Sequence, residues 1–192
     1  MNRKLLVLAG ISFAFAAMAN AQVLNGGFES GLSPWGLSGS VSIGTGVDEG
    51  NLSHSGNSWA YFYGETGTLS QTVSVNTGDS YALTFFMQNY LDGGASTNEL
   101  DVYWNGSELT PSITNVVATP INTYTEYTYN VTAGASLGTL SFTGANTSGQ
   151  TLLDDVSMQD TSATPEPGTL STGLGALMLM TFMARNRFRK SA

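Results

Sequence analysis

The stretch "TLSQTVSVNTGDSYALTFFM" at residues 68–87 decides the fold. Two runs rich in β-branched and aromatic residues flank the turn sequence "NTGDS" (76–80). In that turn Gly allows a positive φ, and Asn or Asp forms local side-chain bonds. In the second run Tyr81, Leu83, Phe85 and Met87 alternate with Ala82, Thr84 and Phe86. Both faces are partly apolar, so the alternation predicts an interior strand of a packed sheet.

The surrounding chain continues this pattern. It shows no sustained helical periodicity, and short apolar runs are separated by Gly, Asn and Asp turns. Strands are predicted at 40–44, 58–63, 68–75, 80–88, 99–104, 124–131, 138–143 and 151–158. Eight strands would form two sheets of about four, so the predicted fold class is all-β, a jelly-roll β-sandwich of about eight strands.

The positive charges mark the two ends of the chain. The 192 residues have a formal charge of −8, and no Lys or Arg lies between Lys4 and Arg185. Lys and Arg beside apolar segments are typical of segments that are inserted into a membrane or translocated across it. At the front, Arg3 and Lys4 precede an apolar run at 5–17 and a small-x-small site at Ala19 and Ala21. Residues 1–21 are therefore predicted to be a signal peptide for the Sec export machinery.

The predicted body is purely acidic. Residues 22–164 hold thirteen of the fourteen acids, Glu166 being the other, and no Lys or Arg, which gives a charge near −13. Such a surface repels nucleic acid, because binding it requires cations that displace counterions. The chain has no cysteine, so an exported domain must depend on its core or on a metal rather than on disulfides. The β-sandwich domain is predicted at 22–160.

The C-terminal end carries three ordered elements. A linker at 161–167 is followed by an apolar run at 168–184 and a basic tail at 185–192. Seventeen residues form a helix of about 25 Å, slightly short of a ~30 Å hydrocarbon core, so the run would be a marginal transmembrane anchor. The tail would stay on the cytoplasmic side. The sorting residues are Pro165, Glu166 and Pro167 in the motif and Arg185, Arg187, Arg189 and Lys190 in the tail.

This ending resembles the PEP-CTERM sorting signal of Gram-negative bacteria. The resemblance implies recognition by an exosortase, which would cut near Pro165–Pro167 and release the body. It also implies export through a transient inner-membrane anchor to the cell surface or the exopolysaccharide matrix. A permanent anchor without processing is the alternative.

The body resembles carbohydrate-binding-module and galactose-binding-like jelly-rolls. The stretches that carry the resemblance are "VLNGGFESGLSPW" (23–35), "SHSGNSWAYF" (53–62), 69–87 and "LLDDVSM" (152–158). In such proteins a structural Ca²⁺ often joins the N-terminal segment to the last strand. The resemblance assigns its ligands to Glu29 and Asp154, with Asp155 as the competitor. Carboxylates suit calcium, and the alternative is that these acids lie on a solvated surface.

A sugar-binding face is the second candidate site. Aromatic rings stack on pyranose faces, and amides or carboxylates bind the hydroxyl groups. The candidate glycan-binding residues are Trp59, Tyr61, Tyr63, Tyr103, Trp104, Glu99 and Asp101, with Tyr90, Gln88 and Asn89 as further members. Glu99, Asp101 and Tyr103 are predicted to share one strand face. Trp and Tyr also fill sandwich cores, and Trp35 in the opening motif is assigned to the core.

Catalysis has little support in the sequence. His54 is the only histidine, it lies in a turn, and no nucleophile-elbow motif accompanies it. Glu99 and Asp101 could form a glycosidase pair, as could many acids in so acidic a domain. The sequence therefore predicts a non-enzymatic surface or matrix protein that binds extracellular polysaccharide. The alternatives are a structural or adhesive protein without sugar affinity and a small glycan-active hydrolase.

Overall fold

Strand β3 (Ser80–Tyr90) shows how the alternation in the sequence becomes buried surface. Tyr81, Leu83 and Phe85 are completely buried, whereas Ala82 and Thr84 are half-buried. The strand pairs antiparallel with β9 on one side and with β7 on the other. The predicted interior position of this strand is therefore confirmed.

The computed structural model describes residues 21–48, 50–90, 98–111, 113–116 and 120–162. These residues form strands and loops and contain no helix, which confirms the all-β class. The other strands are β1 (Gly36–Thr45), β2 (Ser58–Ser74), β4 (Asn98–Trp104), β5 (Ser107–Glu108), β6 (Ile113–Val116), β7 (Thr125–Thr132), β8 (Leu137–Asn146) and β9 (Gln150–Asp160). They belong to one compact unit that ends at Asp160.

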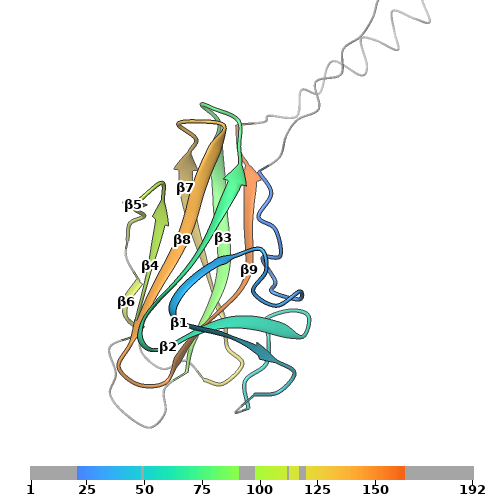
Figure 1. Ribbon diagram of the computed structural model, residues 1–192, viewed down its shortest axis with the longest axis vertical. Helices are drawn as coiled ribbons and strands as arrows, with labels where there is room; N and C mark the ends of the chain where they lie inside the picture. Colours follow the sequence, from blue (N-terminus) through green and yellow to red (C-terminus); the bar gives the residue numbers. More distant parts are fainter. Residues whose placement is uncertain (1–20, 49, 91–97, 112, 117–119, 163–192) are drawn as a thin grey trace, which may run out of the picture. The chain divides into compact units, whose positions relative to one another are not determined.

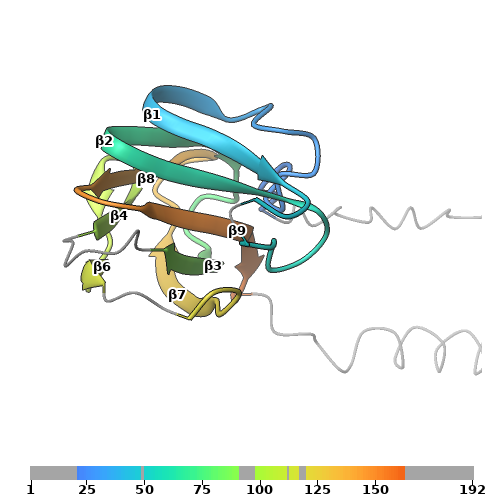
Figure 2. The ribbon, with the colours of Figure 1, turned by 90° about the horizontal axis from the view of Figure 1, so that it is seen from below.

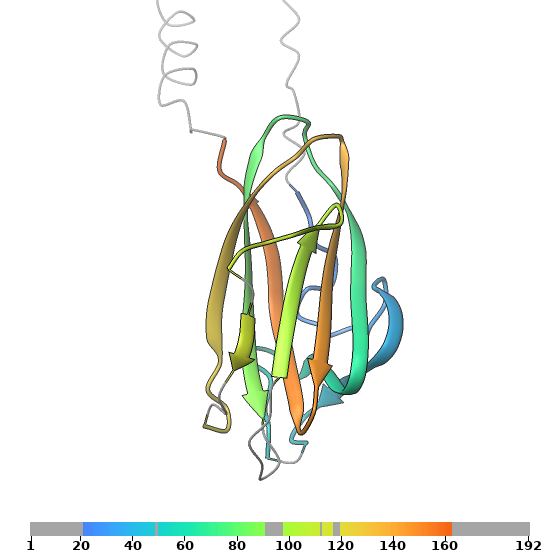
Figure 3. The ribbon, with the colours of Figure 1, turned by 90° about the vertical axis from the view of Figure 1, so that its left-hand side faces the viewer.

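The strands form two layers joined by β2. Hydrogen bonding follows the order β5-β4-β8-β2-β9-β3-β7, while β1 pairs with β2 and β6 with β4. Figure 3 shows β4, β8 and the second half of β2 in front of β7, β3 and β9. The arrangement is a β-sandwich with antiparallel neighbours throughout the described strands.

The predicted strands 58–63 and 68–75 are parts of the single strand β2. Residues 60–63 pair with β9, residues 67–74 pair with β8, and 64–66 pair with neither. Gly64 has a φ of 59°, a conformation that glycine adopts without a steric cost. The chain therefore passes from one layer to the other while β1 still follows it on the outside.

The main core lies between the two layers. Phe85 of β3 contacts Phe142 of β8 in a T-shaped arrangement, with ring centroids 5.1 Å apart. Trp35 approaches Phe142 from the N-terminal segment at 6.2 Å, and it is 5% exposed. Its assignment to the core is confirmed. Each large apolar side chain buried here contributes about 1.5–3 kcal/mol to folding.

A second buried cluster lies beneath the loop 46–57, outside the main core. Ala60 and Phe62 of β2 point into the main core, and Trp59 points to the opposite face. There Trp59 is 1% exposed, and its indole lies so close to Gly44 that a Cβ added to Gly44 would be 2.2 Å from the ring. The loop closes over this face partly through Asn51, whose Oδ1 accepts a bond of 2.8 Å from Gln88 Nε2.

Candidate functional site

The outer surface of the β4-β8-β2 layer carries polar residues in regular rows. On β4 the buried side chains of Leu100 and Val102 alternate with the more exposed Glu99, Asp101 and Tyr103. These three residues share one strand face, as the spacing predicted. The register sets them beside small or hydroxylated residues of β8 and β2, namely Ala145, Thr143, Ser141, Thr68 and Ser70. We call this surface the β4 face.

Carboxyl groups and a phenol meet at the centre of the β4 face. Asp101 lies between Glu99 and Tyr103 on this strand face, and Glu108 of β5 lies opposite Tyr103. Burial raises the pKa of Asp101, and the negative charges of Glu99 and Glu108 raise it further. Burial also raises the pKa of the Tyr103 hydroxyl, and Asp101 adds to that shift. The face therefore offers hydrogen-bond acceptors beside an aromatic ring.

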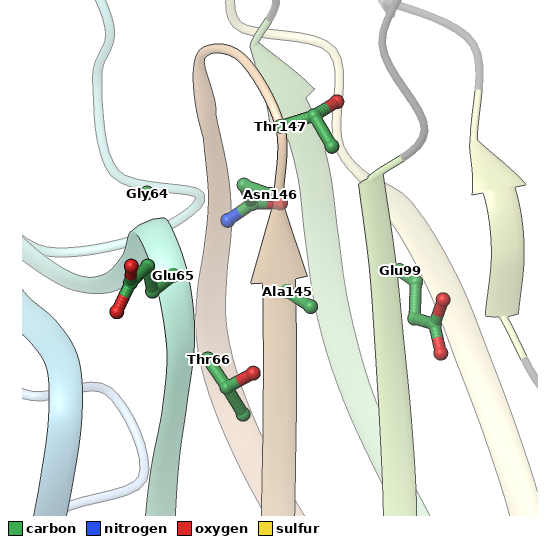
Figure 4. A pocket seen from close by; sticks show the side chains of 7 residues that line it. All are labelled: Gly64, Glu65, Thr66, Glu99, Ala145, Asn146 and Thr147. Atoms are coloured by element: carbon green, nitrogen blue, oxygen red, sulfur yellow. The ribbon is translucent and has the colours of Figure 1, made fainter.

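An open cavity of about 740 Å³ lies at one end of the β4 face. It is lined by Gly64, Glu65, Thr66, Glu99, Ala145, Asn146 and Thr147. Figure 4 shows Glu65 of β2 and Glu99 of β4 on either side of Ala145 and Asn146. Sequence reasoning found only Glu99 among these residues. The lining depends on the bend of β2 and on the β8–β9 turn, which strand periodicity does not reveal.

Two of the predicted glycan-binding aromatics belong to the interior. Trp59 is 1% exposed beneath the loop 46–57, and Trp104 is 6% exposed against Gly138. The Trp104 Nε1–H donates a bond of 3.3 Å to the Thr132 carbonyl oxygen. A buried ring cannot stack on a sugar, so the prediction that these two residues contact glycan is corrected. Glycines at 44 and 138 leave the space that the two indoles fill.

Tyr61 and Tyr63 lie apart from the row on β4. Their rings are 5.7 Å from one another on the first half of β2, and Tyr63 is 43% exposed. That half of β2 pairs with β1 and β9 rather than with β8. Tyr63 directly precedes Gly64 of the cavity lining. The predicted set is thus divided between two halves of the sandwich.

The three predicted metal ligands surround the segment 54–58 that leads into β2. Glu29 Oε1 accepts bonds from the backbone N–H groups of Asn57 and Ser58 at 2.8 and 2.9 Å. Asp154 Oδ2 accepts bonds from the N–H groups of His54 and Ser55 at 2.8 and 3.2 Å. These contacts fasten the loop to the N-terminal segment and to β9.

Asp154 and Asp155 differ in their surroundings. Asp154 is fully buried, and this burial raises its pKa to about 6 although the backbone N–H groups act in the opposite direction. Asp155 is partly exposed, and its Oδ2 lies 2.6 Å from His54 Nδ1. The imidazole stacks on Phe86 at 3.6 Å. His54 thus has a packing and hydrogen-bonding role at the surface of β3 and β9.

The donor set suits calcium only in part. Asp154 and Asp155 each direct Oδ1 toward Gly27, at 3.9 and 3.3 Å from the position of a Cβ there. Glu29 instead uses Oε1 for the backbone of 57–58. Among the described residues, no group of three or more acids or histidines is placed to hold a metal ion. Backbone carbonyls would therefore have to complete a calcium shell, which calcium accepts.

The sorting residues Pro165, Glu166, Pro167, Arg185, Arg187, Arg189 and Lys190 lie outside the described residues, as does nearly all of the predicted signal peptide. In the part of the chain that is described, no helix has the length and apolarity required to cross a membrane.

Solved structures share this fold. The module TmCBM61, solved in complex with β-1,4-galactotriose, is 22% identical with a TM-score of 0.56, and the match covers 72% of this chain and 97% of that one. The CBM22-1 xylan-binding domain of Xyn10C from Paenibacillus barcinonensis is 15% identical with a TM-score of 0.53, covering 78% and 100%. The K1 cleaved adhesin domain of Lys-gingipain from Porphyromonas gingivalis W83 is 15% identical with a TM-score of 0.52, covering 69% and 92%.

At identities of 15–22% these likenesses show a common jelly-roll fold and do not identify a ligand. No family model and no curated protein matches the sequence.

Proposed function

We propose that this protein is a non-enzymatic glycan-binding module whose binding surface is the β4 face together with its cavity. The observation that carries the proposal is the row of Glu99, Asp101 and Tyr103 on an exposed sheet, with Glu99 also lining the cavity. A phenol ring beside carboxylates can stack on a pyranose and accept bonds from its hydroxyl groups. The fold shared with modules solved with galactotriose and described as xylan-binding supports the same function.

The geometry favours binding over hydrolysis. The two carboxylates of a glycosidase stand about 5–10 Å apart, because a sugar ring or a water molecule lies between them. Glu99 lines the cavity and Asp101 does not, so the predicted carboxylate pair does not face a common substrate there. A hydrolase is therefore the weaker alternative, and product formation lost in Glu99→Gln would establish it.

The test is a glycan array followed by titration calorimetry on the best ligand. Tyr103→Ala is expected to weaken binding by about five- to thirtyfold, because one stacked ring contributes on the order of 1–2 kcal/mol. Tyr63→Ala is the matched control, because it removes a phenol from the first half of β2, outside the β4 face. It should change the affinity for the glycan by less than threefold. Loss of binding in Tyr63→Ala alone would move the site to the Tyr61–Tyr63 pair. Absence of binding to any glycan would support the structural or adhesive alternative.

Export completes the proposal. A purely acidic body between cationic ends is consistent with a signal peptide at 1–21 and a sorting segment at 161–192. The mature body would reach the cell surface or the polysaccharide matrix after an exosortase cuts near Pro165–Pro167. Mass spectrometry of the native protein tests this, since a full-length chain recovered from the cytosol would refute it.

A structural calcium ion is the proposed cofactor. Asp154 and Asp155 would supply carboxylate oxygens beside Gly27, and Glu29 would contribute by exchanging one of its backbone contacts for the ion. When bound, the ion would supply positive charge that compensates the buried Asp154 carboxylate. The three carboxylates already hold the loop 54–58, so the ion would reinforce an existing connection between the chain ends.

A further inference from the structure

Strand β1 forms an outer edge of the sandwich. It pairs only with β2, and Figures 1 and 2 show it on the outer side of that strand. Between Val41 and Thr45 the register with residues 58–62 is regular. The Gly46 N–H donates to the Asn57 carbonyl oxygen at 2.9 Å, and these two residues continue the same register.

That bond determines which backbone groups of β1 face outward. In an antiparallel pair, opposite residues alternate between a hydrogen-bonded pair and a non-hydrogen-bonded pair. The Gly46 N–H bond to Asn57 is one of the two bonds of such a pair, the Asn57 N–H donating to Glu29 instead. The register then makes Gly44 and Ser42 the residues that bond to β2. The N–H and C=O groups of Val41, Ile43 and Thr45 consequently point away from β2. Within the described residues, no hydrogen bond reaches these outward groups.

The edge is also free of charge. No charged residue occurs between Glu29 and Asp48, so all of β1 is neutral in a chain of strongly acidic composition. Of the other edge strands, β7 carries Glu126 and β5 carries Glu108, whereas the four-residue β6 is also uncharged. Edge strands of monomeric proteins are usually protected by charged side chains or proline, and the outward part of β1 has neither.

We propose that β1 pairs with β1 of a second copy of this protein, which joins two sandwiches edge to edge. The outward groups repeat at every second residue about Ile43. A two-fold axis at Ile43 therefore places Val41 of one copy opposite Thr45 of the other and Ile43 opposite Ile43. Each of these is a hydrogen-bonded pair, so the same three residues of both copies satisfy one another.

The charge distribution favours a second copy of the protein as the partner of β1. Two strongly acidic bodies repel one another over most of their surfaces, and the neutral edge is where they can approach. A basic partner would find no opposite charge along β1 and would bind the acidic surfaces instead. Pairing through β1 leaves the β4 face uninvolved, so this proposal stands independently of glycan binding.

Sedimentation velocity on the purified full chain over a range of concentrations tests the pairing. A dimer is expected, and it should strengthen when NaCl rises from about 0.05 to about 0.5 M, because salt screens the repulsion between the bodies. Ser42→Glu should weaken it by about tenfold, since the two introduced carboxylates would be diagonal neighbours about 7–8 Å apart. Thr72→Glu is the matched control, because it adds the same charge on β2 away from β1.

Mixing Ser42→Glu with Ser42→Lys protein should restore the dimer, since opposite charges then meet across the axis. Circular dichroism melting confirms that each variant is folded. A chain that stays monomeric up to about 1 mM would overturn the proposal. Equal weakening of the dimer by Ser42→Glu and Thr72→Glu would also overturn the proposal. So would a dimer whose stability Ser42→Glu leaves unchanged, because the contact would then lie in another segment.

Discussion

Removal of the Trp59 indole is expected to reduce stability and leave the β4 face intact. Trp59 is 1% exposed, and its ring lies against Gly44 on the face where the loop 46–57 bonds to Gln88. Truncation of a fully buried Trp or Phe to Ala costs about 3–5 kcal/mol. Each kcal/mol shifts Tm by roughly 3 °C in a domain of about this size. Trp59→Ala should therefore lower Tm by about 10–15 °C.

Urea unfolding followed by fluorescence and circular dichroism measures this loss directly. Trp59→Phe should cost less than half as much, because the Trp59 Nε1–H has no hydrogen-bond partner among the described residues and its removal breaks no bond. Tyr63→Ala, at a position 43% exposed, should cost less than about 1 kcal/mol. A Trp59→Ala protein within about 1 kcal/mol of the parent that no longer bound glycan would refute the assignment of Trp59 to the interior.

Three other predictions concern the loop that Trp59 supports. The pKa of Asp154 is raised from 3.8 to about 6, so the unfolded chain loses this proton at lower pH than the folded one. Stability in EDTA should then fall by up to about 3 kcal/mol as pH rises from about 4 to about 6, and Asp154→Asn should flatten that fall in a pH series of urea titrations. Gly56→Ala should destabilise the protein by about 2 kcal/mol, since Gly56 has a φ of 62° and an added Cβ would lie 2.3 Å from Glu29 Oε1. Gly64→Ala is the control, because Gly64 has a φ of 59° but open space around it, and it should cost about 1 kcal/mol by the same assay. Calcium at about 100 times its Kd should raise the unfolding free energy by about 2.7 kcal/mol relative to EDTA, and equal melting curves in both buffers would exclude the proposed ion.

Local periodicity explains why part of the candidate site was predictable. Side chains two apart on a strand point the same way whatever the strand packs against, so Glu99, Asp101 and Tyr103 had to share a face. Alternation fails at the two acids of "LLDDVSM", which both contact residues 54 and 55 because a bulge with Asp155 at a φ of 48° interrupts β9 there. Their distances from Glu29 and from the segment 54–58 could not follow from spacing, because more than 90 residues separate these segments.

The residues that line the cavity could be identified only from the folded structure. Glu65 and Thr66 lie where β2 leaves one layer for the other, and Asn146 and Thr147 lie at the β8–β9 turn. Glycines at 64 and 67 are the only local sign of that bend. Strands β5 and β6, with 2 and 4 residues, are too short for alternation to be recognised.

The sequence by itself determined the all-β class, the positions of the main strands, the anionic character of the body and the row of polar side chains on β4. These properties depend on residue type and on the two-residue period of a strand. Only the tertiary structure decided which aromatics are buried, because burial depends on what covers a face. Trp59 and Tyr61 point to the same side of β2, yet the loop 46–57 covers Trp59 and leaves Tyr61 partly exposed.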